Sequence, residues 1–283
     1  MPDRSSFTTR SRGAKRDGEL SWGDTEHPWE DEIEANENTS IENGSIRPFI
    51  PDLIPESKTL PAGTHDFEGL RVESNVTVVA EGDHLKDENG EFGGVKIVST
   101  DDVIIEGTID AREQGYPAGY DGPGTPKDQQ YSSGSGYGGL GGGTYDLRDS
   151  GYTYGDPQEA NRLGSGSDYS GANAGGGSVW IVSLNGDIIL NGEILADAME
   201  VEAHGASGGS IRLEADGEIL GNGTVSATGA SVTDDQYAGA GGGGRILFLG
   251  TDNSTITADV SGGVQPGGGY DDGADGHDGS IVR

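Results

Sequence analysis

The sequence lacks cysteine entirely, so no disulfide holds the fold and the redox compartment cannot be inferred from cysteine usage. It also lacks any run of about 18 apolar residues, the length that a membrane-spanning helix needs. The first residues are basic, but neither an apolar segment nor a twin arginine follows, so no common export signal is predicted. We therefore expect no membrane protein, and release by lysis if the protein acts outside a cell.

Apolar and basic residues are scarce. Only 31% of the 283 residues are apolar, too few for the thick core of an ordinary domain of this length. The chain carries 49 acids against 17 Lys and Arg, a formal charge of −32. Such a charge strains a compact state at low ionic strength, but in molar salt the screening length falls to about 3 Å. The composition predicts a folded protein adapted to strong salt; a disordered acidic chain is the alternative, which the β-branched runs oppose.

Glycine, in contrast, is abundant, at 53 residues, without the proline enrichment or the Gly-X-Y period of collagen. One glycine-started hydrophobic segment recurs five times, with spacings of 83, 32, 35 and 35 residues. Its copies start at Gly93 (GGVKIVST), Gly176 (GGSVWIVS), Gly208 (GGSIRLEA), Gly243 (GGRILFLG) and Asp278 (DGSIVR). Recurrence at a nearly fixed period is the sequence signature of a repeat architecture.

A second alternating segment follows each of the first four copies. These segments read VIIEGTIDA from Val103, IILNGEILA from Ile188, GEILGNGTVSA from Gly217 and STITADV from Ser254. Period-two alternation predicts strands with one buried face, and Asn-Gly pairs between them predict sharp corners. Stacked coils could bury a narrow aliphatic column despite the low apolar content. We therefore predict an all-β parallel β-helix (β-solenoid) over residues 68–283; a β-propeller is the main alternative.

Residues 1–67 differ in composition and predict an extended N-terminal anchor arm for assembly. Residues 1–16 hold five bases and one acid, and three prolines within eight residues around position 50 oppose helix and sheet pairing. Docking on acidic protein neighbours is favoured over nucleic-acid binding for so short a basic segment. A disordered leader is the alternative. The predicted anchor residues are Arg4, Arg10, Arg12, Arg16, Trp22, Trp29 and Phe49.

A long insert, residues 112–175, separates the first two copies of the repeat. It is rich in Gly, Ser, Asp and Tyr and contains almost no Ile or Val, which predicts a loop. Tyrosine mixed with small polar residues is typical of recognition surfaces. A covering over the side of the coils, or packing between subunits, is the alternative. The candidate receptor or subunit contacts are Tyr116, Tyr120, Tyr131, Tyr137, Tyr145, Tyr152 and Tyr154.

The polar residues of the sequence raise two questions, whether the protein binds a cation and whether it is a catalyst. Asp271, Asp272, Asp275 and Asp278, among glycines, could hold Ca²⁺ or another structural cation, although their spacing matches no known calcium loop and solvated turns are the alternative. No other cofactor is expected. Catalysis is not predicted: bases are scattered, no histidines have metal-ligand spacing, and carboxylate pairs carry no information in a chain with 49 acids.

The repeat unit at 208–230 resembles the glycine-rich parallel β-helix repeats of adhesins and of viral fibre or spike proteins. The whole layout resembles virion fibre, spike or decoration proteins of halophilic (haloarchaeal) viruses. This resemblance implies a non-enzymatic virion structural protein, a tail fibre, turret or capsid decoration. It further implies a homotrimer that contacts other virion proteins through its arm and a host surface glycan or glycoprotein. A polysaccharide-active β-helix enzyme and a halophile cell-surface adhesin are the alternatives.

Overall fold

A computed structural model gives the fold of the chain. It describes residues 39–42, 45–48, 52–120, 122–126, 133–143, 150–168, 173–233, 238–266 and 274–283. The chain divides into two compact units, residues 1–50 and 51–283. In the first unit, β1 (Thr39–Glu42) pairs antiparallel with β2 (Ser45–Pro48). All seven predicted anchor residues lie outside the described residues.

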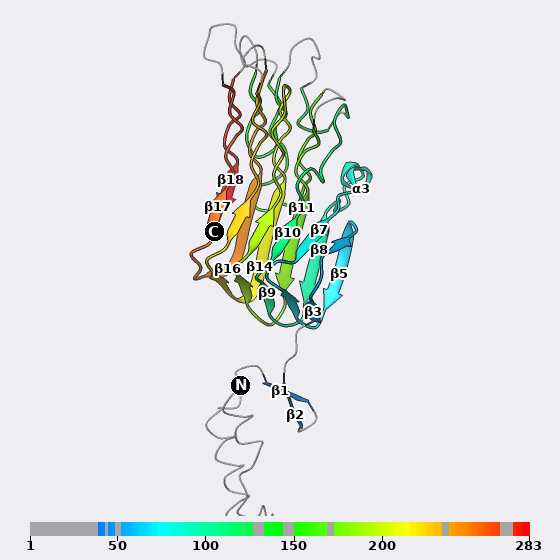
Figure 1. Ribbon diagram of the computed structural model, residues 1–283, viewed down its shortest axis with the longest axis vertical. Coiled ribbons are helices and arrows are strands. Elements are labelled where there is room, and N and C mark those ends of the chain that lie inside the picture. The colour runs from blue at the N-terminus through cyan, green and yellow to red at the C-terminus, as the bar shows by residue number, and fades with distance from the viewer. Residues whose placement is uncertain are drawn as a thin grey trace, which may run out of the picture. The chain divides into compact units, whose positions relative to one another are not determined.

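The strands of the second unit gather in two sheets, both parallel throughout (Figure 1). The smaller sheet has six strands in the order β17-β15-β13-β10-β7-β4. Their bounds are β4 (Lys58–Leu60), β7 (Thr77–Ala80), β10 (Thr108–Asp110), β13 (Glu193–Leu195), β15 (Thr224–Ser226) and β17 (Thr257–Asp259). β4 lies within 1–67, so the sheets begin before the predicted end of the arm.

The larger sheet has ten strands and is held together by its longest member. β14 pairs with β11 through its first half and with β12 through its second half, so two ladders join along one strand. The bounds are β3 (Asp52–Ile54), β5 (Gly63–Phe67), β6 (Leu70–Val72), β8 (Val95–Ser99), β9 (Val103–Ile105), β11 (Ser178–Ser183), β12 (Ile188–Leu190), β14 (Ser210–Gly221), β16 (Arg245–Asp252) and β18 (Ser280–Val282).

The aliphatic core is built from rows of side chains in register across neighbouring strands. In the larger sheet, one row consists of Val95, Val179, Ile211 and Ile246, all fully buried. In the smaller sheet, the matching row consists of Val78, Ile109, Ile194 and Val225, which are also fully buried. Both rows belong to one hydrophobic cluster. Because alternate residues of a strand face opposite sides, the period-two pattern places every second side chain in this cluster.

A large part of the second unit is an array of mostly extended segments outside both sheets, which we call the glycine array. It comprises the described residues of 115–126, 133–143, 150–168, 173–177, 196–209, 227–244, 260–266 and 274–279. In Figure 1 these segments run side by side from one end of the sheets. Successive amides of one segment donate to three different neighbours, each at 2.9 Å: Gly241 to Ala230 O, Gly242 to Ser135 O and Gly243 to His277 O.

Glycine is required in the array because backbones approach one another closely. A Cβ atom added at Gly241 would lie 1.8 Å from the carbonyl oxygen of Ala206. One added at Gly276 would lie 1.8 Å from the carbonyl oxygen of Gly241. No side chain could be tolerated at such distances, and the backbone groups of neighbouring segments bond to one another instead.

The predicted fold class, a parallel β-helix with a loop insert at 112–175, is wrong. That prediction required strands arranged in the successive coils of one solenoid and an insert that lies outside the packed unit. Instead, the strands form two parallel sheets of unequal size, the larger of which is held together by the long β14, and a large part of the unit packs glycine backbone against glycine backbone. The described parts of the insert lie within that array. The prediction assigned the glycines to corners, whereas most of them permit close approach of extended segments.

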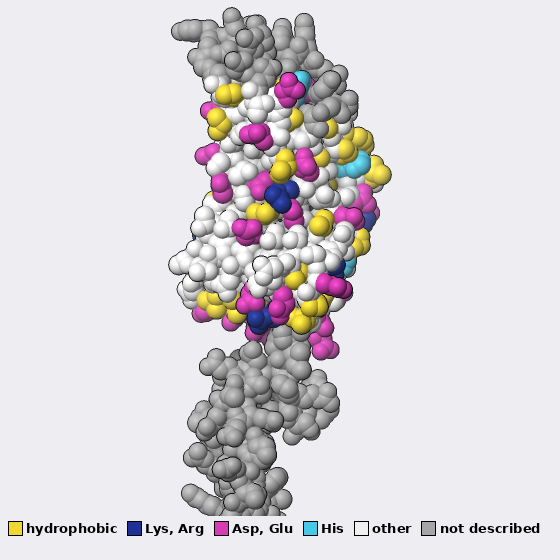
Figure 2. Space-filling model, in the orientation of Figure 1, with side chains coloured by type: hydrophobic (Ala, Val, Ile, Leu, Met, Phe, Trp, Pro, Cys, Tyr) yellow, Lys and Arg dark blue, Asp and Glu magenta, His cyan; other side chains and the backbone are white. Residues whose placement is uncertain are grey.

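The described residues contain a single short helix, α3 (His84–Glu88), between β7 and β8. The side chain of Asp83 caps it by accepting from the amides of Leu85 and Lys86. No helix among the described residues is long and apolar enough to span a membrane. Acidic side chains are spread over the face of the second unit that Figure 2 displays, with few basic ones among them.

Candidate functional site

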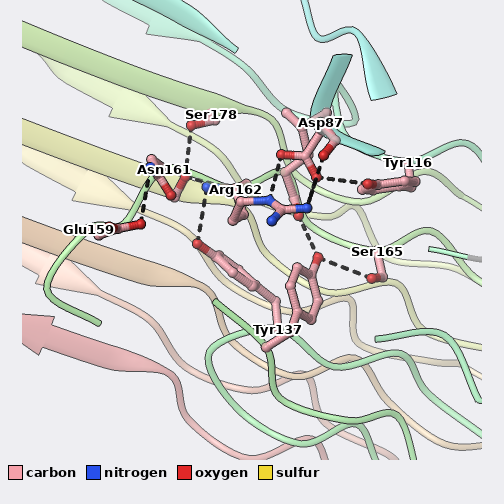
Figure 3. Close-up of polar contacts among 11 residues, drawn as sticks. Asp87, Tyr116, Tyr137, Glu159, Asn161, Arg162, Ser165 and Ser178 are labelled. Atoms are coloured by element: carbon pink, nitrogen blue, oxygen red, sulfur yellow. Dashed lines mark hydrogen bonds and ion pairs between the residues drawn. The ribbon is translucent and has the colours of Figure 1, made fainter. Parts of the chain in front are cut away.

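The most distinctive polar cluster of the described residues is a buried ion pair (Figure 3). Asp87 is fully buried, and its carboxylate accepts from Arg162 Nε at 2.8 Å and from Arg162 Nη2 at 2.9 Å. The hydroxyl of Tyr116 donates to the same carboxylate at 2.7 Å. Three charge-assisted hydrogen bonds therefore hold the Asp87 carboxylate, whose oxygens accept from groups of the protein itself.

The pair joins two distant parts of the chain. Asp87 is presented by α3, whose orientation depends on the Asp83 cap and on Gly93, where a Cβ would lie 2.6 Å from the carbonyl oxygen of Asp83. Arg162 comes from the insert, and its amide donates to the hydroxyl of Tyr137 at 3.4 Å. The pair thus fixes the insert to the segment that precedes β8.

Burial and neighbouring charges raise the pKa values of three groups in the cluster, Arg162, Tyr116 and Tyr137. The hydrogen bond to Asp87 raises the pKa of Arg162. Burial, followed by the Asp87 bond, raises the pKa of Tyr116 well above its ordinary value. Burial raises the pKa of Tyr137 to about 12, against a smaller opposite effect of Arg245. These phenols therefore stay protonated at any ordinary pH and act as hydrogen-bonding groups.

Tyr154 extends the cluster on the other side of Tyr137. Their rings lie 4.7 Å apart at 45°, and burial raises the pKa of Tyr154 well above its ordinary value. The Tyr154 hydroxyl donates to the carbonyl oxygen of Leu163 and accepts from Ser165 Oγ at 3.1 Å. Tyr137 and Tyr154 therefore pack against each other beside the ion pair.

Part of the insert is fastened across the outer face of the larger sheet. Ser210 and Arg212 of β14 and Arg245 of β16 all donate to its carbonyl oxygens. The bonds are Ser210 Oγ to Arg162 O at 2.8 Å, Arg212 Nη1 to Glu159 O at 3.3 Å and Arg245 Nη2 to Tyr154 O at 2.9 Å. Segment 154–163 thus covers two strands of the larger sheet, β14 and β16. A covering role was the alternative to a recognition loop for this insert.

Next to this cover, a tryptophan lies between two cations. Trp180 of β11 is in register with Lys96 of β8 and Arg212 of β14. Lys96 Nζ lies 3.4 Å and Arg212 Cζ lies 4.3 Å from the centre of its ring. The indole N–H donates to Glu214 at 3.3 Å. Both faces of the ring are therefore occupied, so the tryptophan is not available as a platform for a sugar.

The structure places the predicted contact tyrosines in different environments. Tyr116 and Tyr137 are fully buried, Tyr154 and Tyr120 are half-buried, and Tyr152 is 49% exposed. Tyr131 and Tyr145 lie outside the described residues. Of the five described tyrosines, Tyr152 thus offers the most open surface, whereas the buried ones serve packing.

Two members of the predicted cation site are described, and both fix backbone. Asp275 Oδ1 accepts from the amide of Gln265 at 2.6 Å, and Asp278 Oδ1 accepts from the amide of Gly262 at 3.1 Å. Asp271 and Asp272 lie outside the described residues. Over the described stretches, no three His, Asp or Glu side chains lie close enough together to hold a metal ion.

Sequence reasoning missed Asp87 and Arg162. Arg162 was counted only as one of several scattered bases, and Asp87 as one of many acids. The available signal was the position of an arginine inside a glycine-rich stretch, where a buried guanidinium needs a carboxylate. Nothing in the sequence indicates which of the 49 acids supplies that carboxylate.

Searches against protein-family models, curated proteins and solved structures each find no significant match to this chain.

Proposed function

We propose that this chain is a non-enzymatic structural protein of an extracellular particle, a virion, where it presents a rigid acidic unit for assembly and host attachment in strong salt. The observation that carries the proposal is the glycine array. Its segments project from the end of the two sheets and are bonded to several neighbours at once. Such an array fixes its described segments relative to one another, as a presenting scaffold must.

Described residues near the connecting segments of the array bond to one another across segments. The amide of Val232 donates to Val264 O and the amide of Thr233 to Val201 O, each at 3.0 Å. Asn173 Nδ2 donates to the carbonyl oxygen of Met199. Met199 is 43% exposed and Val264 is 58% exposed. Exposed apolar side chains on a rigid, otherwise polar end suit contact with another macromolecule.

The sequence adds a second argument. Each of five segments that connect described stretches of the array carries one tyrosine, at Tyr131, Tyr145, Tyr169, Tyr237 and Tyr270. Tyrosine supplies rigid amphipathic contact area at a low cost in conformational entropy. Recurrence of this residue type in five connecting segments, three of them within the insert, favours recognition of a host glycan or glycoprotein.

Assembly is assigned to residues 1–67, in particular to Trp22 and Trp29, which lie among acidic residues. Large aromatic side chains contribute disproportionately to protein interfaces. A homotrimer with further contacts to other particle proteins is the assembly that we propose.

The proposal is tested by particle fractionation. Full-length chain and a Trp22→Ser, Trp29→Ser variant are each produced in the source host, and particles from the salt-rich medium are separated by density. We expect the unchanged chain to co-sediment with particles and the variant to remain in the soluble fraction. Tyr152→Ser is the control, because a single exposed tyrosine outside the arm should leave incorporation intact. Recovery of the unchanged chain only from cells, or release of sugars from glycans by the purified chain, would overturn the proposal.

A further inference from the structure

Arg245, the first residue of β16, is a cation in an unusual setting. It is 5% exposed and is in register with Ser210 and Ser280. Its Nη1 donates to Ser280 Oγ at 3.0 Å, and its Nη2 donates to Tyr154 O at 2.9 Å. The guanidinium carbon lies 5.3 Å from the centre of the Tyr137 ring. Each of these partners is electrically neutral.

The other arginines of the second unit whose side chains are described have a different environment. Each of them forms an ion pair with a carboxylate, whereas Arg245 has no carboxylate within ion-pair distance among the described residues. The paired arginines are Arg71, Arg112, Arg162, Arg212 and Arg283. The most deeply buried arginine is therefore the one that lacks a counter-charge, in a chain with 49 acids.

One donor of this guanidinium is also unsatisfied. Arg245 Nε is buried and has no hydrogen-bond acceptor. Burial of a charged group without a counter-ion, and of an N–H without an acceptor, are both strongly unfavourable. The hydrogen bonds and the Tyr137 ring compensate for part of the charge, but they leave the Nε donor unexplained.

We propose that Arg245 binds a small monovalent anion, chloride, through its Nε. A chloride ion supplies both a negative charge and an acceptor, the two things that this guanidinium lacks. A phosphate or sulfate ion would need more donors than the hydroxyl-, carbonyl- and ring-lined surroundings offer. The strong salt that the composition predicts would keep such a site filled even at low affinity.

The site would link three parts of the fold, because Arg245 bridges β16, β18 and the cover segment 154–163. A bound anion would therefore stabilise the attachment of the insert to the larger sheet. This effect differs from general screening, since it depends on the identity of the anion and on one residue. It is also independent of the proposed role in a particle.

The test combines diffraction with stability measurements on the full chain. Crystals grown or soaked in sodium bromide are measured at the bromine absorption edge. We expect an anomalous peak within about 3.5 Å of Arg245 Nε, the reach of a hydrogen bond to a halide. In parallel, the unfolding temperature is compared in sodium chloride and in sodium gluconate at equal ionic strength. We expect a higher value in chloride for the unchanged chain and no difference for Arg245→Met.

Arg212→Met is the matched control, because it removes a cation from the same sheet face and should retain the difference between the two salts. A wild-type crystal without a peak at Nε, or with a water there, overturns the proposal. A peak together with an equal chloride effect in Arg245→Met also overturns it, since the ion is then an adventitious ion only. If Arg245→Met does not fold, Arg245→Lys replaces it, which retains the charge but removes the Nε donor, and the wild-type diffraction result decides independently.

Discussion

Asp87 and Arg162 lie 75 positions apart in the chain, yet Arg162 Nε lies 2.8 Å from Asp87 Oδ1. The two ends of this bond have unequal access to water: the Asp87 side chain is fully buried, and that of Arg162 is 32% exposed. A charge that can reach water tolerates the loss of its partner better than one that cannot. The pair should therefore respond differently to removal of either member.

The first prediction concerns that asymmetry. Arg162→Met leaves a buried carboxylate without a counter-charge and should lower the free energy of unfolding by about 3–5 kcal/mol. Asp87→Asn leaves a partly hydrated guanidinium and keeps a polar partner for Tyr116, so it should cost only about 1–3 kcal/mol. Denaturant unfolding in molar salt measures both values. Equal losses in the two variants would contradict the assigned burial.

The second prediction concerns close approach in the glycine array. Gly241→Ala places a Cβ 1.8 Å from a backbone oxygen, so the variant should lose cooperative unfolding or fail to fold. Gly90→Ala is the control: the space around Gly90 is open, and its φ of 79° alone should cost about 1 kcal/mol. Circular dichroism during thermal unfolding compares the two variants. A Gly241→Ala protein as stable as Gly90→Ala would refute backbone-to-backbone packing.

The third prediction concerns alkaline pH. Tyr137 has a pKa near 10 when unfolded and about 12 when folded, so the folded state holds its proton more tightly. Its contribution to stability is complete below about pH 10 and is lost as the pH rises from 10 through 12. Tyr116 and Tyr154 are shifted in the same direction. The chain should therefore unfold in this window, with a rise in tyrosinate absorbance that coincides with loss of structure.

For Tyr137→Phe the alkaline transition should move to higher pH, because one titrating phenol is removed. The matched control is Tyr152→Phe, at an exposed position of the same insert, which should leave the transition in place. An absorbance rise that precedes unfolding would mean that the buried phenols ionise in the folded state.

The fourth prediction concerns the cations on Trp180. Lys96→Met should cost about 0.5–1 kcal/mol, the usual contribution of a partly exposed cation over an aromatic ring. In a Trp180→Leu background the same change should cost almost nothing, and the difference is the coupling energy. Lys58→Met is the control, because Lys58 Nζ lies 5.9 Å from the Phe67 ring and is exposed. Equal costs in both backgrounds would exclude an interaction between Lys96 and Trp180.

The fifth prediction follows from the formal charge of −32. Raising sodium chloride from about 0.1 M to about 1 M shortens the screening length from about 10 Å to about 3 Å. Repulsion among the carboxylates should fall, and the unfolding temperature should rise over this range. Thermal unfolding followed at several salt concentrations tests this expectation. A constant unfolding temperature would oppose adaptation to strong salt.

Local patterns predicted the strands well in places and poorly in others. The alternation around Ile188 and Ile194 indicates which side chains face the core, because the period of a strand is two residues. The glycines at 241 and 276 look the same in sequence as glycines at turns. A glycine has no side chain, so its identity alone does not show whether it forms a corner or a close contact. That depends on the segments that pack against it in the folded protein.

The buried site was even less predictable. Tyr116 and Tyr137 were assigned to a surface because tyrosine among small polar residues is common at binding sites. Their burial depends on Asp87 and Arg162, which approach only when α3 and the insert fold onto the same sheets. A local sequence pattern cannot indicate that Asp87 and Arg162, 75 positions apart, form a pair.

Composition and local patterning are sufficient to predict a strongly acidic chain without disulfides, with repeated strands and a small aliphatic core. These properties depend on residue types and short-range periodicity, which every stretch of the chain carries within itself. Three features became evident from the three-dimensional structure: the strands form two parallel sheets, the glycine segments pack as an array, and a buried ion pair holds the insert. Those features arise from close approach between segments far apart in the chain, and such contacts exist only after folding.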